Sequence, residues 1–86
     1  KVNPPVETLE LIVYPNPTSN FLYAQVPVTG QLEIITINGQ IIKSQSVAQF
    51  TSEVSFDVSR LAQGIYFIRL IGTDGSQTTR KVVIAR

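Results

Sequence analysis

The sequence predicts an all-β domain, a small antiparallel immunoglobulin-like β-sandwich of about seven strands. The 86 residues give room for a single domain. Val, Ile and Thr together make up about a third of the chain, whereas Leu and Ala are scarce, and β-branched side chains favour strands over helices. Short apolar stretches alternate with turns rich in Gly, Pro and Asn, which is typical of small sandwiches.

Seven stretches of apolar and polar residues in alternation are expected to form strands. They are residues 9–14, 20–26, 31–38, 40–47, 53–58, 65–71 and 77–85. Alternate side chains of a strand face opposite sides of a sheet, so one set from each strand should form the core. The predicted core is Val13, Leu22, Ala24, Ile34, Ile37, Val54, Phe56, Val58, Tyr66, Ile68, Leu70, Val82 and Ile84.

The first strand should stop at Pro15-Asn16-Pro17. Each proline fixes its own φ angle and lacks an N–H donor, so the strand cannot continue through this segment. Two further prolines near the start of the chain predict an extended linker over residues 1–8, with the folded domain over residues 9–86.

Two features of the middle of the chain carry specific expectations. The alternation slips at Ile34-Ile35, which indicates a β-bulge or burial on both faces of the third strand. Asn38-Gly39 between two apolar stretches predicts a two-residue hairpin with a type I′ turn. A looser turn should follow at residues 48–51.

The segment Ser59 to Gly64 is the one place where a helical turn is expected, with Ser59 as its cap and Gly64 at its end. The strand at 65–71 carries apolar residues on both faces, so it should be central in its sheet. Thr73-Asp74-Gly75 predicts the hairpin turn that leads into the last strand.

The composition excludes several kinds of chemistry. The chain has no His and no Cys, which excludes Ser-His-Asp and Cys-His nucleophilic sites and ordinary zinc, haem or iron–sulfur ligation. No cofactor, no metal and no enzymatic activity are therefore expected. A net charge of +1 predicts no nucleic-acid binding, and no apolar run reaches the roughly 18–20 residues of a spanning helix, so no membrane insertion is expected.

Carboxylates are the remaining candidates for chemistry, and they are scattered. Glu33, Glu53, Asp57 and Asp74 fall on different predicted strands and turns, which favours surface charges over a catalytic pair. Calcium at Asp57 and Asp74 needs only oxygen ligands, but the spacing of a calcium-binding loop is absent.

Carbohydrate binding is a second open alternative. It would require an exposed row of aromatic rings on one face of the sandwich. The candidates are Tyr14, Tyr23, Phe50 and Phe67.

Four motifs in order resemble those of one known family. They are VYPNP at 13–17, IITINGQII at 34–42, DVSRLAQGIYFIRL at 57–70 and KVVI at 81–84. This series is similar to the C-terminal sorting domains (type A) of the type IX (Por) secretion system. Thr36 stands where that family often has Asp.

The resemblance implies a function and partners. Such a domain is a non-catalytic secretion signal that directs an upstream cargo protein through the outer-membrane type IX translocon. The cargo passes through the periplasm and reaches the cell surface or the medium. A sortase-like surface protease commonly removes the domain, at a site that here would fall near the 1–8 linker or upstream of residue 1. The alternative function is an accessory carbohydrate-binding or spacer module of a secreted enzyme.

The resemblance also suggests which residues the export machinery recognises. An uncovered terminal strand exposes backbone groups that can pair with a partner strand, so the last strand is the first candidate. Lys81 and Arg86 are expected to be exposed charges whose replacement costs little stability. The recognition residues are Pro15, Asn16, Pro17, Gly39, Gly64, Tyr66, Lys81, Val82, Val83, Ile84 and Arg86.

Overall fold

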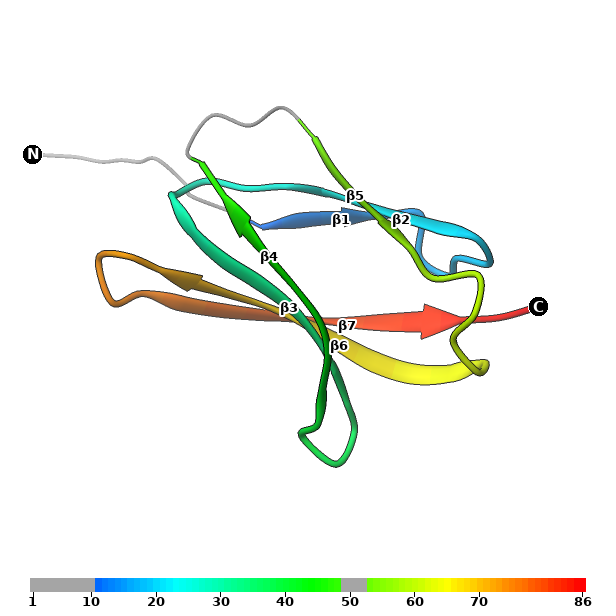
Figure 1. Ribbon diagram of the computed structural model, residues 1–86. Coiled ribbons are helices and arrows are strands. Elements are labelled where there is room, and N and C mark those ends of the chain that lie inside the picture. Colours follow the sequence, from blue (N-terminus) through cyan, green and yellow to red (C-terminus); the bar gives the residue numbers. More distant parts are fainter. Residues whose placement is uncertain (1–10, 49–52) are drawn as a thin grey trace, which may run out of the picture.

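Two antiparallel sheets packed face to face make up the part of the protein that the computed structural model describes, residues 11–48 and 53–86 (Figure 1). These residues form seven strands and no helix, which confirms the all-β prediction. The strands are β1 (Ile12–Tyr14), β2 (Phe21–Gln25), β3 (Gly30–Thr36), β4 (Ile41–Val47), β5 (Val54–Asp57), β6 (Gly64–Gly72) and β7 (Gln77–Ile84). The expected linker at 1–8, the start of the first strand at residue 9 and most of the turn expected at 48–51 lie outside the described residues.

The strand order is that of an immunoglobulin-like sandwich. One sheet has the order β1-β2-β5 and the other has the order β4-β3-β6-β7, with every pairing antiparallel. The first, second and fifth strands thus oppose the third, sixth and seventh, as in immunoglobulin domains. β6 is central in its sheet, as its two apolar faces predicted.

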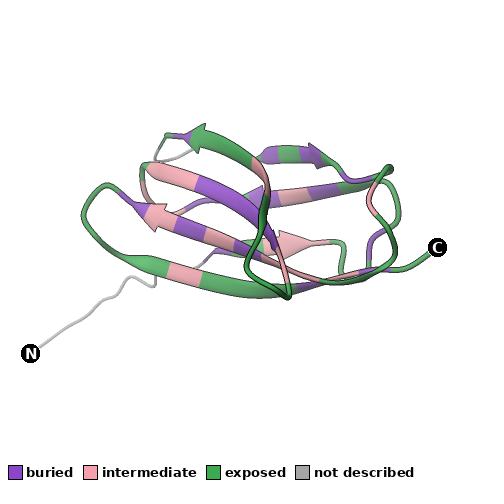
Figure 2. Ribbon diagram, turned by 60° about the horizontal axis from the view of Figure 1, so that its bottom comes forward, coloured by how far each residue is buried: buried purple, intermediate pink, exposed green. Residues whose placement is uncertain are grey.

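The core lies between the two sheets, and the strands contribute alternate residues to it (Figure 2). Leu22 pairs with Phe56 and Ala24 with Val54, so these four side chains share the inner face of the three-stranded sheet. The inner face of the four-stranded sheet supplies Leu32, Ile34, Ile68, Leu70, Val82 and Ile84, all at most 2% exposed.

The predicted core is confirmed except at three positions. Ile37 is 67% exposed, because it follows the last paired residue of β3, Thr36, and lies in the hairpin loop beyond the sheet. Val13 and Tyr66 are half-buried at the margin of the core. The prediction also missed four described residues of the core between the sheets, Leu11, Val26, Leu32 and Val47.

Both explanations for the irregular alternation at Ile34-Ile35 are correct. Ile34 pairs with Lys43 while Ile35 pairs with Ile41, so Ile42 is an extra residue in β4 and the strand is bulged. Ile34 is buried in the core, and Ile35 is 9% exposed on the opposite face of the sheet.

The β3–β4 hairpin has a three-residue loop, so the predicted two-residue type I′ turn is wrong. The Thr36 N–H donates to the Gln40 carbonyl (2.9 Å) and the Gly39 N–H donates to the Thr36 carbonyl (2.9 Å). This loop type needs a positive φ at its last residue, and Gly39 has a φ of 88°. The β6–β7 hairpin has the same pattern, with Gly75 at 92°.

The segment between β5 and β6 is a series of turns, and the expected helical turn is absent from it. The reason is that Ser59 does not act as a cap. Its N–H and its hydroxyl both donate to Oδ1 of Asp57, at 3.0 and 2.6 Å, and these two hydrogen bonds hold the pKa of Asp57 below its ordinary value. The Leu61 N–H then donates to the Val58 carbonyl (3.0 Å), and β6 begins at Gly64.

We predict that Gly39→Val lowers the free energy of unfolding by about 1–3 kcal/mol, because a β-branched residue is strained at a positive φ. No atom lies within 4 Å of a Cβ built at this position, so the cost is one of backbone strain rather than of collision. Gly39→Asn is the matched control. Asn tolerates a positive φ better than Val does, so this variant should lose less free energy of unfolding. Urea denaturation measures both, and equal midpoints for the Val variant and the wild type would contradict the prediction.

Candidate recognition surface

The Pro15-Asn16-Pro17 loop lies against the outer edge of β7. The Asn16 side chain donates from Nδ2 to the Lys81 carbonyl (2.9 Å) and accepts the Val83 N–H at Oδ1 (3.0 Å). An amide group has both a donor and an acceptor, so it can occupy the place of a neighbouring strand residue. Both prolines follow cis peptide bonds.

Thr18 extends this contact along the same edge. The Thr18 N–H donates to the Val83 carbonyl and the Ala85 N–H donates to the Thr18 carbonyl, each at 2.9 Å. The two segments form a short parallel bridge at Ile84, and Thr18 is only 4% exposed. The β7 edge is therefore covered from Lys81 to Ala85, and the expectation of an open terminal edge is wrong there.

Arg86 joins three segments at one end of the molecule. Its guanidinium donates to the backbone carbonyls of Val58 (2.6 Å) and Ser19 (3.0 Å), and to that of Leu61. Figure 1 shows the β1–β2 and β5–β6 loops meeting beside the last residue. Arg86 is exposed, as expected, but its guanidinium is bound to the fold, so its replacement is predicted to cost more stability than that of a free surface charge.

Tyr66 has a structural role that the sequence analysis did not recognise. Its hydroxyl donates to the Ala62 carbonyl (2.7 Å), just before β6 begins. A Tyr at the start of the sixth strand whose hydroxyl binds the backbone upstream is the tyrosine corner of immunoglobulin-like domains. The signal was present in the sequence, as a Tyr two residues after the Gly that opens this strand.

The four predicted recognition residues of β7 point alternately to the two faces of the sheet. Val82 and Ile84 are buried in the core, so their side chains cannot contact a partner. Lys81 and Val83 point to the opposite, outer face of the sheet, where Lys81 is exposed and bonds to none of the described side chains. Gly39 lies apart from the other predicted residues, in the β3–β4 hairpin (Figure 1).

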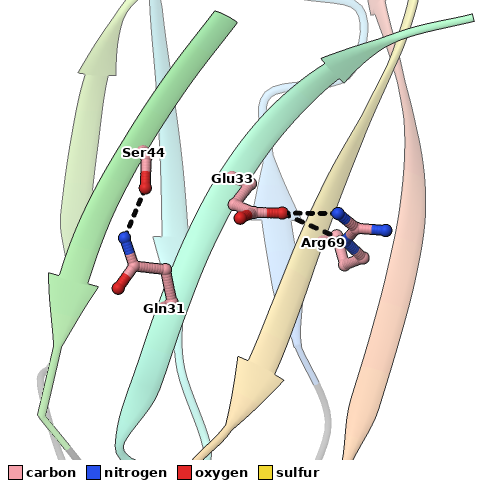
Figure 3. Close-up of polar contacts among 4 residues, drawn as sticks. All are labelled: Gln31, Glu33, Ser44 and Arg69. Atoms are coloured by element: carbon pink, nitrogen blue, oxygen red, sulfur yellow. Dashed lines mark hydrogen bonds and ion pairs between the residues drawn. The ribbon is translucent and has the colours of Figure 1, made fainter. Parts of the chain in front are cut away.

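Polar side chains on the outer face of the four-stranded sheet are paired with each other (Figure 3). Arg69 donates from Nη2 (2.7 Å) and Nε (3.1 Å) to Oε1 of Glu33. Gln31 donates to the Ser44 hydroxyl and accepts a hydrogen bond from Ser46 (3.3 Å). The side chains of Arg69, Glu33, Gln31, Ser44 and Ser46 thus bond to one another within the sheet.

An aromatic row occupies the outer face of the three-stranded sheet. The ring centroids of Tyr14 and Tyr23 lie 5.8 Å apart, and those of Tyr23 and Phe21 lie 6.4 Å apart. The Tyr14 hydroxyl donates to Oε2 of Glu53 (2.5 Å), which raises the pKa of Tyr14. Tyr14 and Tyr23 are directly opposite across the strands, so the row also stabilises the sheet.

The other two candidates for an aromatic row do not join it. Phe67 belongs to β6 in the opposite sheet, and Phe50 lies outside the described residues.

The described residues contain no cluster of three or more acidic side chains that could hold a metal ion. Asp57 and Asp74 lie at opposite ends of β6, so the structure does not bring them together. Asp74 accepts the N–H (2.9 Å) and the hydroxyl (2.7 Å) of Ser76, and these bonds lower the pKa of Asp74. A search of the described residues for a helix long and apolar enough to cross a membrane found none.

The two sheets place the chain in the class of small immunoglobulin-like β-sandwich domains. The family model of the secretion system C-terminal sorting domain matches residues 12–85, and the chain belongs to that family. The domain is a secretion signal for type IX sorting, and it interacts with the type IX secretion system. Proteins secreted by this system end up at the cell surface or outside the cell. No curated protein matches the chain.

We predict that Asn16→Ala lowers the free energy of unfolding by about 1–3 kcal/mol, because two hydrogen bonds to β7 are lost. The Val83 amide should also exchange its hydrogen faster, which nuclear magnetic resonance measures. Asn20→Ala is the control, since the Asn20 side chain is exposed and bonds to no described residue; it should change the free energy by less than about 0.5 kcal/mol. Unchanged exchange at Val83 in the Asn16 variant would contradict the role of the loop.

Loss of the charge at Arg86 should lower the stability of the domain more than loss of the charge at Lys81. Arg86→Gln removes the hydrogen bonds to three carbonyls and should cost on the order of 1–2 kcal/mol. Lys81→Gln removes an exposed charge and should change the free energy of unfolding by less than about 0.5 kcal/mol. Thermal melting of both variants tests this, and equal melting temperatures would show that the Arg86 contacts contribute nothing.

Proposed function

We propose that this domain directs an upstream cargo protein from the periplasm through the outer-membrane type IX translocon. In this proposal residues 1–8 are the linker to the cargo, and residues 9–86 are the sorting domain. A sortase-like surface protease then cuts near the linker. The domain itself has no catalytic role. The family match over residues 12–85 is the single observation that carries the proposal.

The structure supports two different roles for the eleven recognition residues proposed from the sequence: most of them hold the fold together, and two of them face outward. Asn16, between its two prolines, binds β7, and Arg86 binds three loop carbonyls, so these residues position the end of the sandwich. Gly64 and Tyr66 form the corner that starts β6, beside β7. Val82 and Ile84 anchor β7 in the core. Lys81 and Val83 remain as the β7 side chains that a translocon component can contact.

Carbohydrate binding is the second candidate function, and one observation favours it. Tyr14, Tyr23 and Phe21 form a row of neighbouring rings on an outer face, with the Glu53 carboxylate beside it. Aromatic rings and nearby carboxylates can bind the apolar faces and the hydroxyl groups of sugars. Packing between neighbouring strands explains the aromatic row equally well, so carbohydrate binding ranks below sorting as a proposed function.

A fusion tests the sorting function. The chain is joined to the C-terminus of an unrelated periplasmic passenger, in a host with a type IX system, and the passenger should appear at the cell surface or in the medium. The passenger without the domain, and the fusion in a host that lacks the translocon, should both remain in the periplasm. A folded, intact fusion that also stays in the periplasm would contradict the proposal. Micromolar binding of a polysaccharide by the purified domain, lost in Tyr23→Ala, would favour the accessory-module function.

A further inference from the structure

The outer face of the four-stranded sheet has an apolar half, formed by side chains of all four strands. Ile35 pairs with Phe67 on one side and with Ile41 on the other, and Ile65 pairs with Val83. Directly paired residues point to the same side of a sheet, so these five side chains form one surface. We call this surface the apolar patch; it consists of Ile35, Ile41, Ile65, Phe67 and Val83.

The apolar patch is partly exposed: Ile41 and Ile65 are exposed, Phe67 and Val83 are half-buried, and Ile35 is buried. Ile41 is 49% exposed and Ile65 is 48% exposed, and Ile37, 67% exposed, follows Thr36 at the end of β3 next to the patch. The solvent-facing side of an antiparallel sheet is normally polar. Gathered apolar side chains on such a face usually mark an interaction site.

The charges of this face indicate what kind of partner fits. Glu33, the acidic residue of this face among the described strands, accepts two hydrogen bonds from Arg69. Lys81 lies directly opposite Phe67 at the margin of the apolar patch and bonds to none of the described side chains. Among the described residues, the one charge of this face without a side-chain partner is therefore positive.

We propose that the apolar patch and Lys81 dock a protein component of the export route that presents apolar side chains and a carboxylate facing Lys81. The proposal rests on the sorting function and names the surface by which the secretion system recognises the domain. Burial of the exposed isoleucines supplies affinity, and the Lys81 ion pair fixes orientation.

Other occupants fit this face less well. A second copy of the chain that docked through the same face would offer Lys81 the Glu33 carboxylate as the acidic group of its described strands, and Arg69 already binds that carboxylate. An anionic membrane attracts clusters of basic residues, whereas this face has a single unpaired cation, Lys81, among the residues that the structure describes. A sugar needs many hydrogen-bond partners, and the patch offers aliphatic side chains and one phenyl ring.

The test compares two double variants in the passenger fusion. Ile41→Thr with Ile65→Thr makes the apolar patch polar, while Thr keeps the β-branched shape that strands favour. Ile12→Thr with Phe21→Thr is the matched control on the opposite sheet, where these residues are 45% and 47% exposed. Export should fall by about tenfold or more in the first variant and remain near the wild-type level in the second.

Lys81 provides an independent measurement, because its side chain is exposed and bonds to none of the described side chains. Lys81→Glu should reduce export severalfold, and Lys81→Arg should restore most of it, while the melting temperatures of both variants match the wild type. If the double isoleucine variant fails to fold, the comparison of the two Lys81 variants alone tests whether this face docks a partner.

The remaining outcomes separate this proposal from its rivals. Wild-type export by the Ile41/Ile65 variant, or an equal loss in the control pair, would overturn it. Flotation of the purified domain with vesicles of phosphatidylcholine and phosphatidylglycerol, lost in the patch variant, would instead assign the patch to a membrane. If the wild-type fusion itself is not exported, the sorting function fails before the variants are compared.

Discussion

The closed edge of β7 is the interaction on which the rest of this structure depends. A terminal strand presents a row of unpaired backbone groups, and here the Asn16 side chain and the Thr18 backbone bind that row from Lys81 to Ala85. The contact holds β7 in place, so Val82 and Ile84 reach the core while Lys81 and Val83 face outward. It also brings the β1–β2 loop to the position where Arg86 binds it.

Local patterns in the sequence were sufficient to predict the strands and most of the core. Alternation of side chains is a property of each strand alone, so it can be recognised without knowledge of the fold. It failed at Ile37 because the pattern continues past the last residue that pairs with β6. The Asn38-Gly39 turn was placed correctly but given the wrong loop length, since two-residue and three-residue hairpins both accept Gly at a positive φ.

The recognition surface was harder to predict, because its contacts join residues that are far apart in the sequence. Asn16 and Lys81 are 65 residues apart, and Arg86 and Ser19 are 67 apart. The family resemblance pointed to Asn16 and Arg86 but did not reveal that both bind the fold itself. The apolar patch had one visible signal, the two apolar faces of residues 65–71, but its extent depends on the register of four strands.

The pairing of the β1–β2 loop with the last residues has a consequence for biosynthesis. Asn16, Thr18 and Ser19 find their partners only when residues 81–86 have left the ribosome, so the native sandwich cannot close before these residues are made. Contacts this distant in sequence form late, and a chain that stops early leaves its core open. The β1–β2 loop therefore joins the rest of the sandwich only after β7 has been synthesised, and a folded domain shows that this last strand is present.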